Sequence, residues 1–193
     1  MKIAVTGGIG SGKSYVVHLL QQRGLTVYDC DAAAKRLMRS SDDLKASLCA
    51  LIGPHAYTVE GMLNKAEVAR FLLLSEDNAR AIDAIVHPAV AVDFVDSGAT
   101  WMECAILYES GFNRLVDRVV VVTAPEALRL ERVMHRDGIS QDKACQWIQR
   151  QWPQDEVRRR ADFEIINDGQ TDLEVQLSKL WKQLGLWEQE ASK

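Results

Sequence analysis

Residues 6–14 read TGGIGSGKS and predict a site that binds phosphate. From Gly7 to Ser14 they fit the spacing G-x-x-x-x-G-K-[ST], in which glycines let successive main-chain N–H groups turn toward an anion. In such a loop Lys13 would bridge the outer phosphates of a nucleoside triphosphate, and the hydroxyl of Ser14 would be a ligand of Mg²⁺. The loop does not identify the reaction, because nucleotide switches, motor ATPases and small-molecule kinases all share it.

Two carboxylates, Asp29 and Asp31, follow the second apolar segment of the chain in the sequence YDCDA. In a doubly wound sheet the carboxyl end of this strand faces the same crevice as the phosphate loop. A carboxylate there can accept a proton from a hydroxyl group, or hold a metal ion through water. Asp31 also directly precedes a helical pattern and is a favoured N-cap residue type. The sequence leaves both roles open for Asp31, and the two are compatible.

The elements that must position these residues alternate along the chain. Segments with strand character lie at residues 2–6, 25–29, 100–108, 118–124 and 163–168. The run at 118–124 is almost entirely apolar, which is typical of a strand buried on both faces of a parallel sheet. We therefore predict an α/β fold in which a parallel sheet is flanked by helices.

Helical patterns fill most of the chain between these strands. A helix is expected at 14–23, and the stretch from Asp31 to His87-Pro88, where a helix should end, is far longer than a simple crossover. A further helix is expected at 125–137. A closing helix carries its apolar side chains on one side, and Trp187 is expected to pack beside it. These side chains are Leu173, Leu177, Leu180, Trp181 and Leu184.

The composition argues against several classes of protein. With 23 basic and 27 acidic side chains, the formal net charge is −4, so a nucleic-acid backbone is not expected as the main partner. No apolar run is long enough to span a bilayer and no leader pattern opens the chain, so neither membrane insertion nor secretion is expected. The four cysteines lack the spacing of a zinc site, and we expect reduced thiols in a cytoplasmic protein.

Six segments together resemble the dephospho-coenzyme A kinases in order and spacing: TGGIGSGKS, DCDAAAKRL, HPAV, AILYESG, RDGIS and RADFEIINDG. The resemblance spans nearly the whole chain. It implies a Mg²⁺-dependent kinase that transfers the terminal phosphoryl group of ATP to the ribose 3'-hydroxyl of dephospho-coenzyme A, the last step of coenzyme A synthesis. The implied P-loop NTPase fold has a core (residues 1–31, 98–135 and 161–193), a helical acceptor domain (32–97) and a lid (136–160).

The resemblance also implies roles for single residues. Asp31 would be the base for the ribose hydroxyl, Arg136 would close with the lid over ATP, and Lys13 would complete the catalytic set. The acceptor would contact Asp31, His87 and Glu109. The residues implied to bind ATP are Gly8, Gly10, Ser11, Gly12, Lys13, Ser14, Tyr15 and Asn167, with Ser14 as the metal ligand.

This sequence departs from the family pattern at some positions. Tyr15 stands where the family usually has Thr after the loop serine, which puts the contacts with the inner phosphates in doubt. Ala105 replaces a proline that usually precedes the family's Leu-Leu pair, which should shift a strand end slightly. In the lid, Val157 replaces a position that is commonly basic, which casts doubt on one acceptor contact.

Several of the implied residues also fit a structural role. The pair His87-Pro88 reads equally well as a helix joint with a packed histidine. Asn167 and Gly169 have residue types that any strand-to-helix turn favours. Arg136 also fits a solvated charge near a helix C-terminus, with Arg132 as a second candidate for phosphate contact.

Two other functions share parts of this pattern. A nucleoside monophosphate kinase or sugar kinase would have the same loop, insert and arginine-bearing lid. A GTP switch would need N-K-x-D and D-x-x-G motifs in suitable places, and the sequence has neither.

Overall fold

A computed structural model describes residues 1–75 and 77–186, and it divides the chain into two compact units. The sheet unit comprises Met1–Val27 and the chain from Thr100 onward. The helical unit comprises Tyr28–Ala99. The finer division into core, acceptor domain and lid that the sequence suggests remains a prediction. Trp187 lies outside the described residues.

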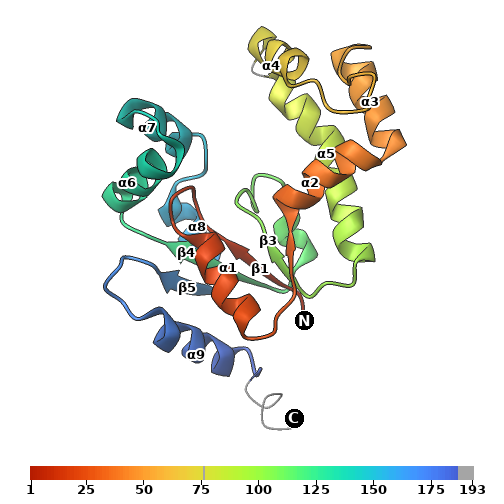
Figure 1. Ribbon diagram of the computed structural model, residues 1–193. Helices are drawn as coiled ribbons and strands as arrows, with labels where there is room; N and C mark the ends of the chain where they lie inside the picture. The colour runs from red at the N-terminus through yellow and green to blue at the C-terminus, as the bar shows by residue number, and fades with distance from the viewer. Residues whose placement is uncertain (76, 187–193) are drawn as a thin grey trace. The chain divides into compact units, whose positions relative to one another are not determined.

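The strands form one five-stranded sheet in the order β2-β3-β1-β4-β5 (Figure 1). The pairs β1–β3, β1–β4 and β4–β5 are parallel. The parallel sheet and its helices confirm the predicted α/β fold. The strands are β1 (Ile3–Thr6), β2 (Val27–Asp29), β3 (Trp101–Glu103), β4 (Arg118–Thr123) and β5 (Phe163–Ile166).

Strand β3 is shorter than the sequence predicted, since it ends at Glu103 and not at Tyr108. The chain then forms turns in which Cys104 and Leu107 are buried. An apolar run shows that a segment is buried, but it does not distinguish a buried strand from a buried turn. This early end places the carboxylate of Glu103 at the carboxyl edge of the sheet.

Helices of the sheet unit cover both faces of the strands. Alternate strand residues such as Ile3 and Val5 pack in one core with α1 and α9, while Thr6 and Val121 lie on the other face with Val157 of α8. Leu177, Leu180 and Trp181 of α9 and its C-cap residue Leu184 are buried, as the closing-helix pattern predicted, and Leu173 is partly buried against the same core. The helices are α1 (Lys13–Gln22), α6 (Glu126–Asp137), α7 (Gln141–Gln149), α8 (Gln154–Arg160) and α9 (Leu173–Gln183), with a 3₁₀ turn at Phe112–Leu115.

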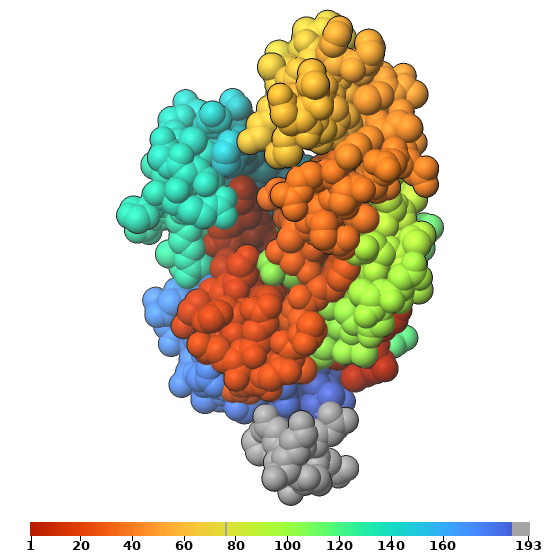
Figure 2. Space-filling model, turned by 45° about the vertical axis from the view of Figure 1, so that its right-hand side comes forward, coloured from red at the N-terminus to blue at the C-terminus, as the bar shows by residue number. Residues whose placement is uncertain are grey.

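The helical unit contains α2 (Cys30–Ser40), α3 (Asp42–Ile52), α4 (Lys65–Leu74) and α5 (Asp77–Asp96). Helices α2 and α3 begin at side-chain caps, because Asp29 accepts from the N–H of Ala32 and Ser41 accepts from that of Leu44. Helix α4, yellow in Figure 2, carries exposed leucines at its end. None of the helices in the described part of the chain combines the length and the hydropathy of a membrane span.

Helix α5 corrects one expectation, because it continues through His87-Pro88 instead of ending there. A proline inside a helix costs about 3 kcal/mol through a lost hydrogen bond and a steric clash. Val86, Val90 and Phe94 are spaced four residues apart and are all buried. Each such side chain contributes about 1.5–3 kcal/mol on burial, so packing on both sides of Pro88 outweighs its cost.

Candidate active site

The phosphate loop connects β1 to α1. Two of its positions require glycine, both because of their backbone φ angles and because neighbouring atoms leave no room for a Cβ. Gly10 and Gly12 have φ angles of 79° and 83°, which are unfavourable for other residues. A Cβ at Gly10 would lie 2.5 Å from the main-chain oxygen of Arg129, and one at Gly12 would lie 2.0 Å from Nδ2 of Asn167. The loop is therefore packed tightly against α6 on one side and against the residue after β5 on the other.

Lys13 and Ser14, the first residues of α1, converge on the carboxylate of Glu103. Nζ of Lys13 is ion-paired with Oε1 of Glu103, and Oγ of Ser14 donates a hydrogen bond of 2.9 Å to the same oxygen. In the sheet, Glu103 lies beside Val5 of β1, two residues before the loop. Sequence reasoning missed Glu103. A carboxylate at a strand end was its only signal, and the predicted strand ran past it.

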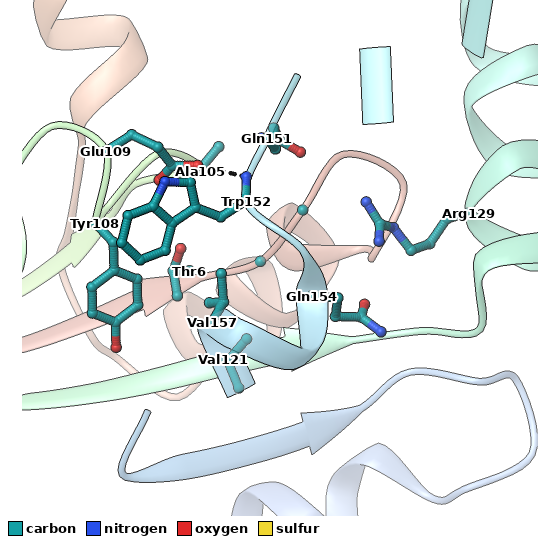
Figure 3. A pocket seen from close by; sticks show the side chains of 12 residues that line it. Thr6, Ala105, Tyr108, Glu109, Val121, Arg129, Gln151, Trp152, Gln154 and Val157 are labelled. Atoms are coloured by element: carbon teal, nitrogen blue, oxygen red, sulfur yellow. Dashed lines mark hydrogen bonds between the residues drawn. The ribbon is translucent and has the colours of Figure 1, made fainter. Parts of the chain in front are cut away.

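Two side chains from outside the loop hold both polar groups of Ile9. Nε of Arg129, on α6, donates to the Ile9 carbonyl at 3.0 Å, and Oε1 of Gln151 accepts from the Ile9 N–H at 2.7 Å. In Figure 3 the guanidinium group of Arg129 reaches from α6 toward the loop. Neither residue was predicted from the sequence, because neither belongs to a recognised motif.

Asn167 and Arg132 hold the far side of the loop. Asn167 is buried and donates from Nδ2 to the carbonyl of Ser11 at 2.9 Å. Nη1 of Arg132 lies 3.3 Å from the carbonyl oxygens of both Gly10 and Ser11, and its Nη2 lies 3.4 Å from Oδ1 of Asn167. Of the predicted site residues, Asn167 is thus in contact with the loop.

The other loop residues with predicted roles differ in exposure. Ser11 is fully buried, and its Oγ has no hydrogen-bond partner among the described residues. Tyr15 lies in the first turn of α1, and the residue is 56% exposed. The main-chain N–H of Tyr15 donates a hydrogen bond of 3.0 Å to the carbonyl of Gly12, at the start of the helix.

Glu109 contributes to a cluster next to the loop. Its Oε1 accepts from the main-chain N–H of Trp152 at 3.1 Å, the dashed line in Figure 3. The rings of Tyr108 and Trp152 stack with centroids 5.8 Å apart and planes 8° apart, and the guanidinium carbon of Arg160 lies 4.8 Å from the Trp152 ring. Burial raises the pKa of Tyr108 above its ordinary value. A cavity of about 10 Å³ beside this cluster is also lined by Gly8 of the loop.

Arg136 lies at the end of α6 and makes its hydrogen bonds to its neighbour rather than to the phosphate loop. Nε and Nη2 donate to the two carboxylate oxygens of Asp137 at 3.0 and 2.7 Å. This bidentate pair lowers the pKa of Asp137 and raises that of Arg136. The Arg136 side chain is 61% exposed, so the ion pair is accessible to solvent.

Asp31 and His87 belong to the helical unit. Asp31 is exposed in the first turn of α2, and Asp29 is the N-cap of that helix, so the capping role considered for Asp31 is wrong. The helix begins at Cys30, two residues earlier than the pattern indicated, which leaves the cap position to Asp29. Nε2 of His87 lies 3.6 Å from Oδ1 of Asp83, one helical turn earlier.

A hydrogen-bond network fixes the residue just before this cap. The phenol of Tyr28 donates to Oδ2 of Asp93 on α5 at 2.6 Å, and Arg36 of α2 is ion-paired with the same oxygen. The Tyr28 ring also packs edge-on against Phe94, with centroids 5.3 Å apart. Burial and the hydrogen bond to Asp93 raise the pKa of Tyr28 well above its ordinary value. The start of α2, and with it Asp31, is thereby tied to α5.

Comparisons with known proteins show which family the chain is similar to. The model of a family described as dephospho-CoA kinase matches residues 1–172. A dephospho-CoA kinase of Bacteroides fragilis is 40% identical over 187 residues, covering 93% of this chain and 91% of that protein. A crystal structure of a Thermus thermophilus protein is 32% identical, with a TM-score of 0.80 over 95% of this chain and 97% of the other. The structure of the dephospho-CoA kinase from Campylobacter jejuni, at 20% identity, supports the fold alone, with a TM-score of 0.67 over 95% and 98% of the two chains.

Proposed function

This chain belongs to the dephospho-CoA kinase family, and from that premise we propose how its residues carry out phosphoryl transfer from ATP to dephospho-coenzyme A. The activity and the P-loop kinase fold follow from the family. The residue roles are our proposal, and the convergence of Lys13 and Ser14 on Glu103 is the observation that carries it.

The phosphate loop would bind ATP through main-chain N–H groups that its glycines leave accessible. Lys13 would exchange its partner, from Glu103 to the outer phosphate oxygens of the nucleotide. The N-terminal end of α1 adds its partial positive charge at the same place. Because the transferred phosphoryl group carries charge that spreads over its oxygens, a preorganised cradle of this kind lowers the barrier mainly by positioning and electrostatics.

A Mg²⁺ site is part of the proposal, and the donor set fits this ion. Ser14 supplies a hydroxyl and Glu103 a carboxylate, and both are hard oxygen groups held 2.9 Å apart. The described residues contain no cluster of three His, Cys, Asp or Glu side chains that would form an all-protein cage. Mg²⁺ typically takes one or two protein ligands together with phosphate oxygens and water, and Ser14 and Glu103 would provide the protein ligands. The ion would neutralise phosphate charge during transfer.

The acceptor side of the proposal rests on Asp31 of the helical unit. Its carboxylate is exposed and is not engaged as the helix cap, so it is available to accept the proton of the ribose 3'-hydroxyl. His87 and Glu109 are proposed as contacts of the acceptor. Arg136 would release Asp137 and turn to the phosphates when the lid closes, since an exposed ion pair is worth little.

We further propose that the protein works in the cytoplasm. All four cysteines are thiols. Cys30 and Cys104 are buried, and Cys49 and Cys145 are partly exposed. Reduced cysteines are the expected state in that compartment.

Transfer of labelled phosphate from ATP tests the proposed function. The protein is incubated with dephospho-coenzyme A in one series, and with a panel of nucleoside monophosphates and simple sugars in another. We expect product only with dephospho-coenzyme A, labelled at the ribose 3'-oxygen. Transfer only to monophosphates or sugars would overturn the assignment of the acceptor and leave the phosphate-loop assignment intact.

A further inference from the structure

Arg129 is a buried cation that no carboxylate neutralises. Its side chain lies under the phosphate loop, and the residue is 5% exposed. Within residues 1–75 and 77–186, no Asp or Glu oxygen lies close enough to form an ion pair with it. Burial lowers the pKa of its guanidinium, and the negative charge of Glu126 only partly offsets this. The group nevertheless stays protonated at neutral pH, because the guanidinium of arginine is a very strong base.

The contacts of Arg129 concentrate on the first half of the loop. Its Nε donates to the carbonyl of Ile9 at 3.0 Å. A Cβ at Gly8 would lie 2.6 Å from its Nη2 and 3.4 Å from Oε1 of Gln151. The guanidinium group therefore lies directly against the main chain of Gly8 and Ile9, at the end of the loop opposite Lys13.

The other basic side chains considered for the site have partners of other kinds. Lys13 is paired with Glu103 and Arg136 with Asp137. Arg132 has carbonyl and amide oxygens for its donors. A buried charge without a counter-ion costs several kcal/mol. Binding of an oppositely charged ligand next to it recovers part of this free energy. The partner that this loop receives is an anion.

We propose that Arg129 is a positioning residue of the phosphate loop whose charge is completed by the outer phosphates of the bound nucleotide. This inference rests on the proposed binding of ATP at the loop. The hydrogen bond to Ile9 holds the loop open for phosphate, and the uncompensated charge adds attraction that grows with the number of phosphates. In the weakly polar surroundings of a buried group, this attraction is screened far less than at the surface.

Three variants separate the charge from the hydrogen bond. Arg129→Gln keeps an amide N–H that can reach the Ile9 carbonyl but removes the charge. Arg129→Lys keeps the charge but loses the planar fork. Glu131→Gln, on an exposed position of the same helix, changes the charge of α6 without touching the loop and is the matched control. Dissociation constants for ADP, ATP and inorganic tripolyphosphate are measured calorimetrically in the absence of Mg²⁺, and melting temperatures are recorded without ligand.

For Arg129→Gln we expect ATP and tripolyphosphate to bind roughly 10- to 100-fold more weakly, the range for losing one charged partner. The affinity for ADP should fall clearly less than that for ATP. The melting temperature without ligand should stay the same or rise. Arg129→Lys and Glu131→Gln should keep the wild-type preference for ATP over ADP. If Arg129→Gln fails to fold, Arg129→Lys decides, because loss of that preference in the lysine variant contradicts the proposal.

Two outcomes would overturn the inference. If Arg129→Gln binds all three ligands as the wild type does, the charge is not part of the site. If its affinities for ADP and ATP fall by the same factor, Arg129 has only a structural role in the loop. A wild-type protein that shows the expected phosphate dependence but does not phosphorylate dephospho-coenzyme A would support the inference and refute the acceptor assignment. A wild type that binds no ATP would overturn both.

Discussion

Ser14 and Glu103 share a hydrogen bond of 2.9 Å, although 89 positions separate them in the chain. The bond joins the first turn of α1 to the end of β3, with the ammonium group of Lys13 on the same carboxylate oxygen. In this arrangement a carboxylate holds the lysine and the serine of the phosphate loop in position before a nucleotide arrives. Such a pre-formed site reduces the ordering that binding would otherwise require.

Glu103→Gln should therefore affect the metal dependence of the reaction more than nucleotide binding. The amide keeps the size of the side chain but is a poorer partner for a metal ion and for its bound water. We expect turnover to fall roughly 10- to 100-fold and the Mg²⁺ concentration for half-maximal activity to rise. A Mg²⁺ titration of phosphoryl transfer measures this, with Glu131→Gln as control. An unchanged Mg²⁺ requirement would show that Glu103 only anchors Lys13.

Asp31→Asn should leave ATP binding nearly intact and reduce turnover by about 10²- to 10⁴-fold, the usual contribution of a general base. Asp29→Asn is the matched control, because asparagine is also a good N-cap and should preserve α2 and activity. Single-turnover transfer and calorimetric titration with ATP measure the two effects separately. If Asp29→Asn is the inactive variant instead, the base has been assigned to the wrong carboxylate.

Lys13→Ala should weaken both ATP binding and turnover, because the lysine interacts with phosphates before and during transfer. Removing the ammonium group also leaves the carboxylate of Glu103 without its ion-pair partner. The affinity for ATP and the transfer rate are compared with those of Asp31→Asn under the same conditions. A Lys13→Ala protein with normal ATP affinity would contradict the proposed position of the phosphates.

Gly12→Ala should destabilise the protein and abolish nucleotide binding, while Gly24→Ala should only destabilise it. Both glycines have left-handed φ angles, 83° and 86°, so both variants carry about 1–2 kcal/mol of backbone strain. A Cβ at Gly12 would also overlap Asn167, whereas a Cβ at Gly24 would have no atom of the described residues within 4 Å apart from its chain neighbours. Urea unfolding and ATP titration of the two variants test this difference. Equal stability losses with equal ATP affinity would contradict the close packing of the loop.

Asp168→Asn should lower stability at neutral pH but not in acid. The carboxylate of Asp168 accepts from the N–H groups of Thr171 and Gln170, at 2.7 and 2.9 Å, and these bonds lower its pKa below the usual 3.8. The stabilisation is complete above the unfolded-state pKa and is lost as the pH falls through the lower folded-state pKa. Melting curves of the two proteins should therefore differ at neutral pH and converge in acid. A pH-independent difference would indicate that charge is not involved.

The sequence by itself determined the phosphate loop, the parallel α/β fold and the family. The first two follow from local spacing: glycines and Lys13-Ser14 within one loop, and apolar periods within single strands and helices. The family follows from the resemblance of six segments along the chain. It placed Asn167 at the site through a family motif, and the structure shows it against the loop. It was wrong at Pro88, where it predicted the end of a helix, because the continuation of α5 depends on what Val86 and Phe94 pack against.

Only the tertiary structure decided which residues surround the loop. Glu103 meets Ser14 because β3 is the neighbour of β1 in the sheet, and Arg129 meets Ile9 because α6 lies against the loop. Pairings between distant segments depend on the packing of the whole unit and leave no periodic signal in either segment. The identity of the cap at the start of α2, Asp29 rather than Asp31, was decided in the same way, by where the strand ends.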